Sequence, residues 1–297
     1  MPVQPSRQTT ILVISVAVLA VAIGIGGPAL LAPPPTTDGD SVAPVTETMT
    51  RFAIAGDTGT GAPAVFATAE QMRMQSQRDS YDALLLLGDL IYDTGDSALV
   101  DERITTPFAS ITSAGARLLP VLGNHDYQDG EQKEILEALD HDESWYTEMV
   151  GSVRVIVLDS NQVENDEQQE WLRSTLSERV PKGTWTIVAM HHPPYSAGQH
   201  GSDMAVRERW CPLFAEFKVP LVLAGHDHDY QRSLPQDGVT YIVSGAGATL
   251  RPAGRADFTS VSTSTLHYLD LQADREKLVG RAIDQEGGIL DTFAISR

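Results

Sequence analysis

The sequence predicts an α/β fold, in which buried strands of a sheet alternate with helices, and two observations predict it. Short apolar runs recur along the chain, and nearly all end in a glycine or a polar cluster. Buried strands have this character when other layers cover both faces of their sheet. Segments with the spacing of amphipathic helices lie between these runs, and such alternation is typical of α/β proteins.

Six apolar runs are the expected strands of the first part of the domain: residues 52–55, 83–87, 118–122, 153–158, 184–190 and 219–224. Residues 63–72 are predicted to be helical, because a proline start is followed by apolar side chains at i, i+3 and i+4, and residues 171–176 repeat that spacing. Beyond Thr240 the pattern changes to strands and turns, at residues 241–243, 265–271, 278–282 and 290–295. The end of the chain is therefore expected to add antiparallel strands.

The amino-terminal segment is expected to lie outside this core. The stretch from Ile11 to Ala32 carries no charge. As a helix it would be about 33 Å long, against about 30 Å for the hydrocarbon core of a bilayer. Residues 1–32 are interpreted as a membrane anchor or as a signal peptide cleaved near Ala22, and the Pro- and Thr-rich residues 33–50 as a linker.

The charges that flank this stretch predict the location of the domain, residues 51–297. Arg7 precedes the stretch and Asp38 follows it. By the positive-inside rule, everything beyond Asp38 lies outside the cytoplasm. The domain is therefore expected to be extracytoplasmic, either membrane-anchored through the amino-terminal segment or secreted.

The charge of the chain limits its partners. It has 40 acidic and 21 basic residues, a net charge of −19. A protein that tracks nucleic acid through its phosphates is therefore excluded, because such binding needs an excess of basic charge. Few charged residues precede Arg51, so the acidic excess belongs to the domain itself. The lone cysteine, Cys211, excludes an intramolecular disulfide.

Polar clusters follow the expected strands directly. Ligands of open α/β sheets bind at the carboxyl ends of the strands, and each cluster follows such an end. The sequence therefore predicts that seven side chains gather in one region of space: Asp57, Asp89, Asn124, His125, His191, His226 and His228.

The residue types of this group indicate metal binding. Carboxylate and imidazole groups suit first-row metals such as Fe, Mn and Zn, and the lack of cysteine disfavours a structural zinc site. The group is too large for one ion. Two metals about 3.5–4 Å apart, sharing a bridging carboxylate, would accommodate it and would clamp both oxygens of an in-line phosphoryl displacement.

Five short blocks carry a resemblance to a known family. They are Gly56-Asp57-Thr58-Gly59, Gly88-Asp89-Leu90-Ile91-Tyr92, Gly123-Asn124-His125-Asp126, Val188-Ala189-Met190-His191 and Gly225-His226-Asp227-His228. In this order they resemble the metal-binding blocks of the calcineurin-like metallophosphoesterases, and the resemblance covers about residues 51–297. It implies the metallophosphoesterase fold, a four-layer α-β-β-α sandwich of two mixed β-sheets flanked by helices.

Two positions relate the chain to one branch of that family. Most members carry a histidine two residues after the first aspartate, where this chain has Gly59. Small purple acid phosphatases carry a tyrosine three residues after the second aspartate, where this chain has Tyr92. A trivalent ion stabilises a phenolate far below the free pKa of about 10. The resemblance to the purple acid phosphatases therefore implies iron(III).

The resemblance also implies residue roles. Fe(III) would be held by Asp57, Asp89, Tyr92 and His228, and a second ion, Fe(II), Zn or Mn, by Asp89, Asn124, His191 and His226. Asp89 would bridge this dinuclear centre. A metal-bound hydroxide would attack the phosphorus of a small phosphomonoester, while His125 and His200 stabilise the transition state and protonate the leaving oxygen. Asp126 is expected to orient His125 through its other ring nitrogen.

Alternatives to this assignment stay open. A phosphodiesterase or nucleotidase of the wider superfamily, with Mn or Zn in both sites, would use the same blocks, although Gly59 disfavours it. A binding protein without activity would have lost ligands, and none of the seven is missing. Tyr92 could instead be a packing aromatic. His192, His267 and Cys211 are expected to be structural.

Overall fold

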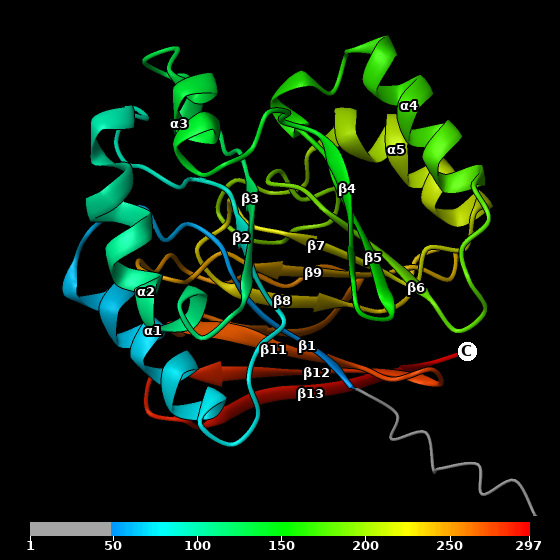
Figure 1. Ribbon diagram of the computed structural model, residues 1–297. Coiled ribbons are helices and arrows are strands. Elements are labelled where there is room, and N and C mark those ends of the chain that lie inside the picture. Colours follow the sequence, from blue (N-terminus) through cyan, green and yellow to red (C-terminus); the bar gives the residue numbers. More distant parts are fainter. Residues whose placement is uncertain (1–48) are drawn as a thin grey trace, which may run out of the picture. The chain divides into compact units, whose positions relative to one another are not determined.

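Residues 49–297 are described by a computed structural model of the chain (Figure 1). The predicted amino-terminal segment, residues 1–32, lies outside these described residues, as does all of the linker, residues 33–50, except its last two positions. Among residues 49–297, no helix is both long enough and apolar enough to cross a membrane.

Two mixed β-sheets form the centre of the described part. The first has the strand order β13-β12-β11-β1-β2-β3, and the second has the order β10-β8-β9-β7-β6-β5-β4. The first sheet consists of β1 (Thr50–Ala55), β2 (Ala83–Leu87), β3 (Arg117–Val121), β11 (His267–Ala273), β12 (Lys277–Asp284) and β13 (Ile289–Ser296). The second consists of β4 (Tyr146–Val150), β5 (Val153–Val157), β6 (Trp185–Ala189), β7 (Leu221–Ala224), β8 (Tyr230–Ser233), β9 (Thr240–Ser244) and β10 (Thr259–Thr263).

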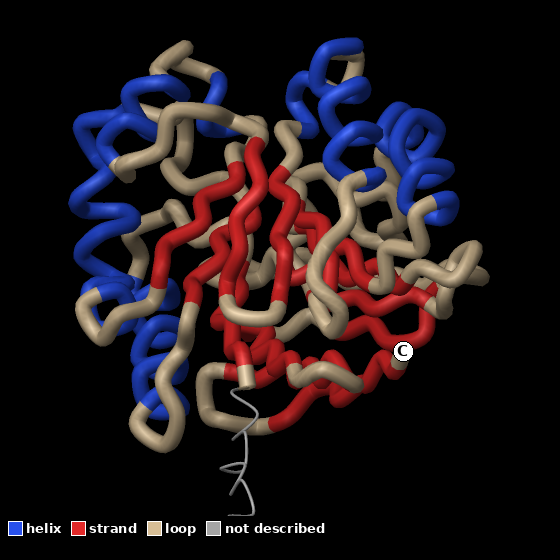
Figure 2. The backbone as a smooth tube through the Cα atoms, turned by 45° about the vertical axis from the view of Figure 1, so that its right-hand side comes forward, coloured by secondary structure: helices blue, strands red, loops and turns tan. Residues whose placement is uncertain are grey.

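Helices cover the outer faces of both sheets, as Figure 2 shows with the strands in the middle and helices on either side. They are α1 (Pro63–Ser76), α2 (Thr106–Thr112), α3 (Gln132–Ala138), α4 (Asp166–Ser177) and α5 (Met204–Glu216). The first three pack on the first sheet, and α4 and α5 pack on the second. The expected four-layer sandwich of two mixed sheets between helices is therefore confirmed.

Strand β1 shows how the sequence builds these layers. Phe52 and Ile54 point toward the second sheet and join the core between the sheets. Ala53 and Ala55 point to the other face and pack under α1. Both sets are fully buried, because successive side chains of a strand alternate between two covered faces. This explains why the strand reads as a continuous apolar run.

The parallel strands bring their carboxyl ends to a common edge. β1, β2 and β3 pair in parallel, as do β5, β6, β7 and β9. The prediction of antiparallel strands near the end of the chain is confirmed for β11, β12 and β13. It is wrong in part for residues 241–243, because β9 is parallel to β7 and antiparallel only to β8.

Three strands and three helices were not predicted from the sequence: β4, β8, β10, α2, α3 and α5. Strand β4 lies at a sheet edge and alternates partly buried and exposed positions, so it has no apolar run. Strand β8 is polar in sequence yet buried, and its Gln231 forms side-chain hydrogen bonds to Ser196 and Asp229. Helix α5 contains Pro212 in its interior, which interrupts the pattern that predicts a helix.

A buried ion pair joins the start of the domain to its end. Arg51 on β1 donates to both carboxylate oxygens of Asp270 on β11, at 3.0 and 2.7 Å. Arg281 on β12 donates to the same carboxylate at 2.8 Å. Asp270 has no exposed surface, and the Arg51 side chain is only 4% exposed. The carboxylate thus balances a guanidinium that has almost no access to water.

We expect Asp270→Ala to lower the free energy of unfolding by about 3–5 kcal/mol, because it leaves the Arg51 charge buried without a partner. Glu70→Ala is the control, since Glu70 forms an exposed ion pair with Arg73 and should cost less than about 1 kcal/mol. Urea unfolding of both variants measures the difference. Equal losses would show that the buried pair does not stabilise the fold.

Candidate metal centre

The predicted ligands are positioned by sharp turns at the ends of the strands. Asp57 follows β1, Asp89 follows β2 and His226 follows β7. All three have positive φ angles, of 57°, 51° and 71° respectively. Non-glycine residues rarely adopt this left-handed conformation, which costs about 1–3 kcal/mol and occurs preferentially at functional sites. These three residues therefore adopt an unfavourable backbone conformation, which turns their side chains toward the shared edge of the sheets.

One group of donors surrounds the Tyr92 hydroxyl. This hydroxyl lies 3.2 Å from Asp57 Oδ1, 2.8 Å from Asp89 Oδ2 and 3.1 Å from His228 Nε2. His228 Nε2 also lies 3.3 Å from Asp57 Oδ1. These four residues are the ones expected to hold iron(III), and the structure brings their donor atoms together.

A second group surrounds His191. Its Nε2 lies 3.1 Å from Asn124 Oδ1, 3.2 Å from His226 Nδ1 and 3.4 Å from Asp89 Oδ1. Asp89 thus presents one carboxylate oxygen to the first group and the other to the second. This is the place expected for a bridging carboxylate.

The spacing of these donors fits metal ions. Ligand atoms about 2.1 Å from one ion lie about 3.0 Å apart in an octahedron and about 3.4 Å apart in a tetrahedron. The separations within both groups, 2.8 to 3.4 Å, fall in this range. Asp57 and Asp89 are both almost fully buried, and buried carboxylates require a compensating cation or partner. The residues present therefore fit two bound ions.

Outer hydrogen bonds orient the imidazole rings. His191 Nδ1 lies 2.8 Å from the main-chain oxygen of Leu87, and His228 Nδ1 is hydrogen-bonded to Thr249. When Nδ1 donates to the Leu87 oxygen, the proton is fixed there and the lone pair of Nε2 points into the site. Such second contacts are typical of histidines that bind metals.

The electrostatic environment keeps the His226 and His228 rings in the neutral form that binds metals. Burial, followed by the Arg251 charge, lowers the pKa of His228 to about 4, and burial with the neighbouring histidines strongly lowers the pKa of His226. Both rings are therefore neutral at pH 7, as metal ligands must be. Burial and the charges of Asp57 and Asp89 raise the pKa of the Tyr92 phenol. A highly charged cation in contact with its oxygen would reverse that shift.

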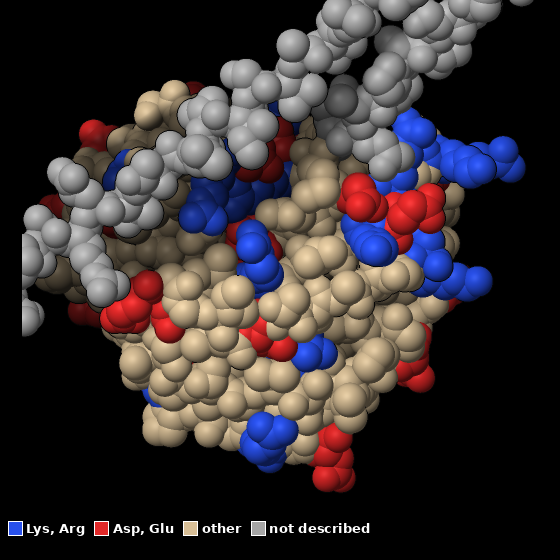
Figure 3. All heavy atoms as spheres, turned by 90° about the horizontal axis from the view of Figure 1, so that it is seen from below, with Lys and Arg blue, Asp and Glu red and all other residues tan. Residues whose placement is uncertain are grey.

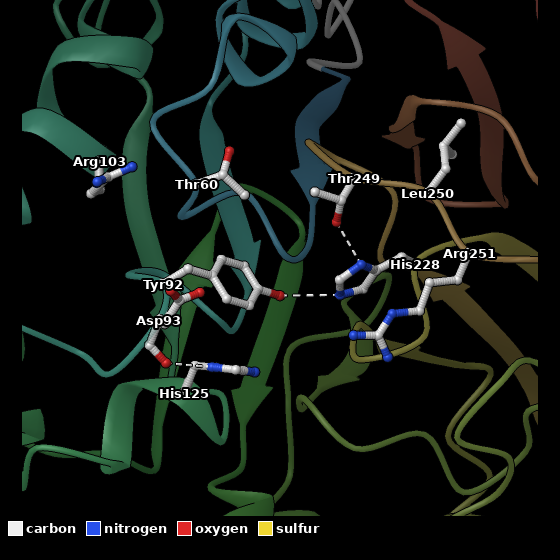
Figure 4. A pocket seen from close by; sticks show the side chains of 9 residues that line it. All are labelled: Thr60, Tyr92, Asp93, Arg103, His125, His228, Thr249, Leu250 and Arg251. Carbon is white, nitrogen blue, oxygen red and sulfur yellow. Dashed lines mark hydrogen bonds between the residues drawn. The ribbon is translucent and has the colours of Figure 1, made fainter.

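The histidines expected near the phosphate lie on different sides of the donor groups. The His125 ring lies 4.6 Å from the Tyr92 ring, and its Nδ1 is hydrogen-bonded to the Asp93 main-chain oxygen (Figure 4). The His200 ring lies 4.4 Å from the His226 ring. His125 is partly exposed and His200 is exposed, so both are open to a ligand above the donors.

The expected role of Asp126 is wrong. Its carboxylate is fully buried and accepts hydrogen bonds from the main-chain N–H groups of Leu90, Ile91 and Gly123, at 3.1, 2.9 and 2.7 Å. Nδ1 of His125 is instead hydrogen-bonded to the main-chain oxygen of Asp93. Asp126 therefore ties the loop after β2 to the loop after β3 and does not orient His125. Burial and the Asp89 charge raise its pKa to about 7.

The structure also explains why position 59 is a glycine and not the histidine expected for most members of the family. A Cβ atom at this position would lie 2.2 Å from the carbonyl of Leu90 and 2.4 Å from the Ile91 nitrogen. No side chain fits there unless the loop after β2 moves. A histidine ligand at position 59 is thus incompatible with the loop that carries Tyr92.

Several residues at the site were missed by sequence reasoning. A cavity of about 440 Å³ above the first donor group is lined by Thr60, Arg103, Thr249 and Arg251, besides Tyr92 and the histidines (Figure 4). His192, expected to be structural, lies with its ring 4.7 Å from the His226 ring, and ring nitrogens of His191, His192 and His226 lie close enough together to hold a metal ion. No recurring spacing marks these residues, and His192 had only its adjacency to His191 as a signal.

Two other structural assignments agree with the structure. His267 is buried and hydrogen-bonded to Ser244 Oγ at 3.0 Å, away from the donor groups. Cys211 is buried in α5.

Comparisons with known proteins point in one direction. A family model described as calcineurin-like phosphoesterase matches residues 50–230. An uncharacterised protein of Mycobacterium tuberculosis is 31% identical over 189 residues, which cover 52% of this chain and 35% of that protein. Human tartrate-resistant acid phosphatase type 5 is 28% identical over 245 residues, which cover 69% of this chain and 75% of the relative.

A solved structure shares the fold. The purple acid phosphatase PPD1 from yellow lupin seeds superposes with a TM-score of 0.74 and 22% identity, covering 84% of this chain and 54% of that one. The matched region thus spans about half of the lupin chain and about a third of the mycobacterial relative.

We expect Asp126→Asn to lower the free energy of unfolding by about 3 kcal/mol, because the amide group turns one acceptor oxygen into a donor that faces main-chain N–H groups. Asp129→Asn, at an exposed site nearby, is the control and should change stability by less than about 0.5 kcal/mol. NMR titration of the His125 ring in both variants tests the alternative. If Asp126→Asn changes the titration curve of the His125 ring and leaves stability unchanged, Asp126 does orient His125.

Proposed function

Because this chain belongs to the calcineurin-like phosphoesterase family, we propose that it is a phosphatase of the purple acid type that hydrolyses small phosphomonoesters at a pair of metal ions. The observation that carries the proposal is the position of the Tyr92 hydroxyl, within 3.2 Å of Asp57, Asp89 and His228. A packing aromatic would not place its hydroxyl among two buried carboxylates and an imidazole. The names of the human and lupin relatives support the same branch.

In this proposal, Asp57, Asp89, Tyr92 and His228 hold Fe(III), and Asp89, Asn124, His191 and His226 hold Fe(II), Zn or Mn. A phenol oxygen is a hard ligand and favours the trivalent ion, whereas amide and imidazole ligands suit a divalent one. Bound cations of this kind polarise phosphoryl oxygens and lower the pKa of bound water.

The protein's own side chains would handle the charge and the protons of the reaction. His125 Nδ1 is held at the Asp93 main-chain oxygen, so its Nε2 faces the donor groups and lies 4.0 Å from Asp89 Oδ2. His200 is held by its main-chain N–H, which donates to Asp227 at 2.8 Å. We assign both rings to the phosphoryl oxygens and the leaving alcohol, where a positioned histidine can hold or donate a proton.

The alternative is a phosphodiesterase or nucleotidase with Mn or Zn in both sites. The closed space at Gly59 disfavours it, since the histidine typical of most members cannot be present in this loop. Rates on a phosphomonoester and a phosphodiester, each measured with iron, zinc and manganese, separate the two. Faster hydrolysis of the phosphodiester than of the phosphomonoester, without iron, would support the alternative.

We also propose that residues 51–297 act outside the cytoplasm, held to the membrane or secreted through residues 1–32. This part of the proposal is supported by the sequence alone, through the uncharged stretch from Ile11 to Ala32 and the charges around it. In cells that express the full chain, an anchored domain is expected to be digested by protease added to intact cells. A secreted domain is expected in the medium. Protection of the domain until the cells are lysed would contradict it.

Iron-loaded wild-type protein is expected to be violet, because a tyrosinate bound to iron(III) absorbs visible light by charge transfer. Tyr92→Phe should remove this band. Tyr127→Phe is the control, because Tyr127 donates to Asp159 outside the donor groups. Absorption spectra with iron content measured on the same samples test this. A colourless, iron-free wild type with full activity would contradict the iron assignment.

His125→Ala and His200→Ala are each expected to lower kcat by about a hundredfold or more, because each removes a group that holds a proton or charge in the transition state. Metal content should stay that of the wild type, since neither ring belongs to the donor groups. His141→Ala is the control, as His141 is hydrogen-bonded to Leu118 at the other end of β3. Wild-type rates in both variants would show that neither ring takes part in the reaction.

A further inference from the structure

Two arginines line the cavity above the donor groups, on opposite sides. In Figure 4, Arg103 lies on the left and Arg251 on the right, with Tyr92 and His228 between them. Arg103 comes from a helical turn before α2, and Arg251 comes from the loop after β9. They therefore reach one cavity from both sheets of the fold.

Arg251 lacks an acidic partner within the described part of the chain. Its guanidinium is hydrogen-bonded to His200, and its main-chain N–H donates to the His228 oxygen at 2.9 Å. No carboxylate of residues 49–297 lies within 4.0 Å of it. Many other arginines do form such pairs: Arg51, Arg73, Arg117, Arg154, Arg173, Arg209, Arg232 and Arg281. In a domain with so many carboxylates, a guanidinium that lines the cavity without an acidic partner indicates an anionic ligand.

Arg103 is only weakly neutralised. Its Nε lies 3.4 Å from Glu102 Oε1, but Glu102 is 64% exposed and the contact is not a hydrogen bond. Exposed pairs of this kind contribute little. The guanidinium rests against Gly61, where a Cβ atom would lie 2.3 Å from Nη1. The glycine thus leaves the space in which Arg103 reaches the cavity.

The cavity lining is basic overall, although Asp93 belongs to it. Asp93 is exposed, so water screens its charge. Arginine is the residue best suited to planar, bidentate contacts with phosphoryl or carboxylate oxygens. A volume of about 440 Å³ is that of a small-molecule site. Two guanidinium groups across such a cavity fit one small ligand with two anionic groups.

We propose that the preferred substrate is a small phosphate ester whose alcohol carries a second anionic group, with Arg251 at the oxygens of the reacting phosphoryl group and Arg103 at the second anion. Arg251 is assigned to the reacting group because it contacts His200 and lies beside His228. Arg103 is the specificity residue. The inference rests on the proposed phosphatase function and adds the class of alcohol that the site accepts.

Binding of three unreactive ligands to the metal-loaded, full-length protein tests this by calorimetry. Methylphosphonate carries one anionic group, phosphonoacetate adds a carboxylate, and methylenediphosphonate adds a second phosphonate. Wild type should bind at least one of the two-anion ligands about tenfold or more tightly than methylphosphonate. The ligand with the larger gain identifies the second group as carboxylate or phosphoryl.

Arg103→Gln should lower the affinity for that two-anion ligand about tenfold more than the affinity for methylphosphonate, and Arg103→Lys should lose less. Arg251→Gln should weaken all three ligands together. Arg78→Gln, an exposed arginine beyond the far end of α1, is the control and removes the same charge. The affinities of the variants and the wild type are compared at equal metal loading. Binding of the ligands to free metal then cancels, because only the ratio of the variant affinity to the wild-type affinity is used.

The outcomes separate this inference from the proposed function. If the wild type hydrolyses phosphomonoesters but Arg103→Gln changes all three affinities equally, the substrate class is wrong and the phosphatase stands. If the metal-loaded wild type neither binds methylphosphonate nor hydrolyses any phosphomonoester, both are overturned. A tenfold loss confined to the two-anion ligand supports the assignment of Arg103.

Discussion

Two carboxylates buried side by side, Asp57 and Asp89, are the constraint on which the site depends. Burial raises the pKa of Asp57 well above its usual range. At Asp89, the neighbouring His191 ring and the hydrogen bonds from the His125 main-chain N–H and the Tyr92 hydroxyl outweigh burial and lower the pKa. The protein thus keeps at least one buried negative charge at the edge shared by both sheets. Bound cations would balance that charge, and the surrounding imidazole, amide and phenol groups complete the set of donors for them.

The close packing of loops around these carboxylates explains the glycines at the strand ends. A Cβ atom at Gly123 would lie 2.1 Å from the Asp89 nitrogen, and one at Gly225 would lie 2.7 Å from Asp57 Oδ2. Any larger residue would occupy the space of a donor. The face shown in Figure 3 carries mainly uncharged side chains, with basic and acidic ones interspersed.

The sequence predicted the elements and site residues that a pattern can reveal. Apolar runs ending in glycine and a polar residue marked β1, β2, β3 and β7, because strands covered on both faces are usually apolar throughout. Strand β8 gave no such signal, since hydrogen bonds from Gln231 replace apolar burial. Asp126 was assigned wrongly, because adjacency to His125 does not show that its carboxylate accepts three main-chain N–H groups. Arg103, in a helical turn, and Arg251, in a loop, were missed, because single arginines follow no spacing and only the folded chain places them together.

The central claim is that these donors hold two ions, with Asp89 between them. Anomalous diffraction from a crystal of the metal-loaded protein, measured on both sides of the iron absorption edge, tests it most directly. The account predicts two anomalous peaks about 3.5 Å apart, one on each side of the Asp89 carboxylate, with an iron signal at least at the peak next to the Tyr92 oxygen. One peak only, or peaks away from these side chains, would contradict it.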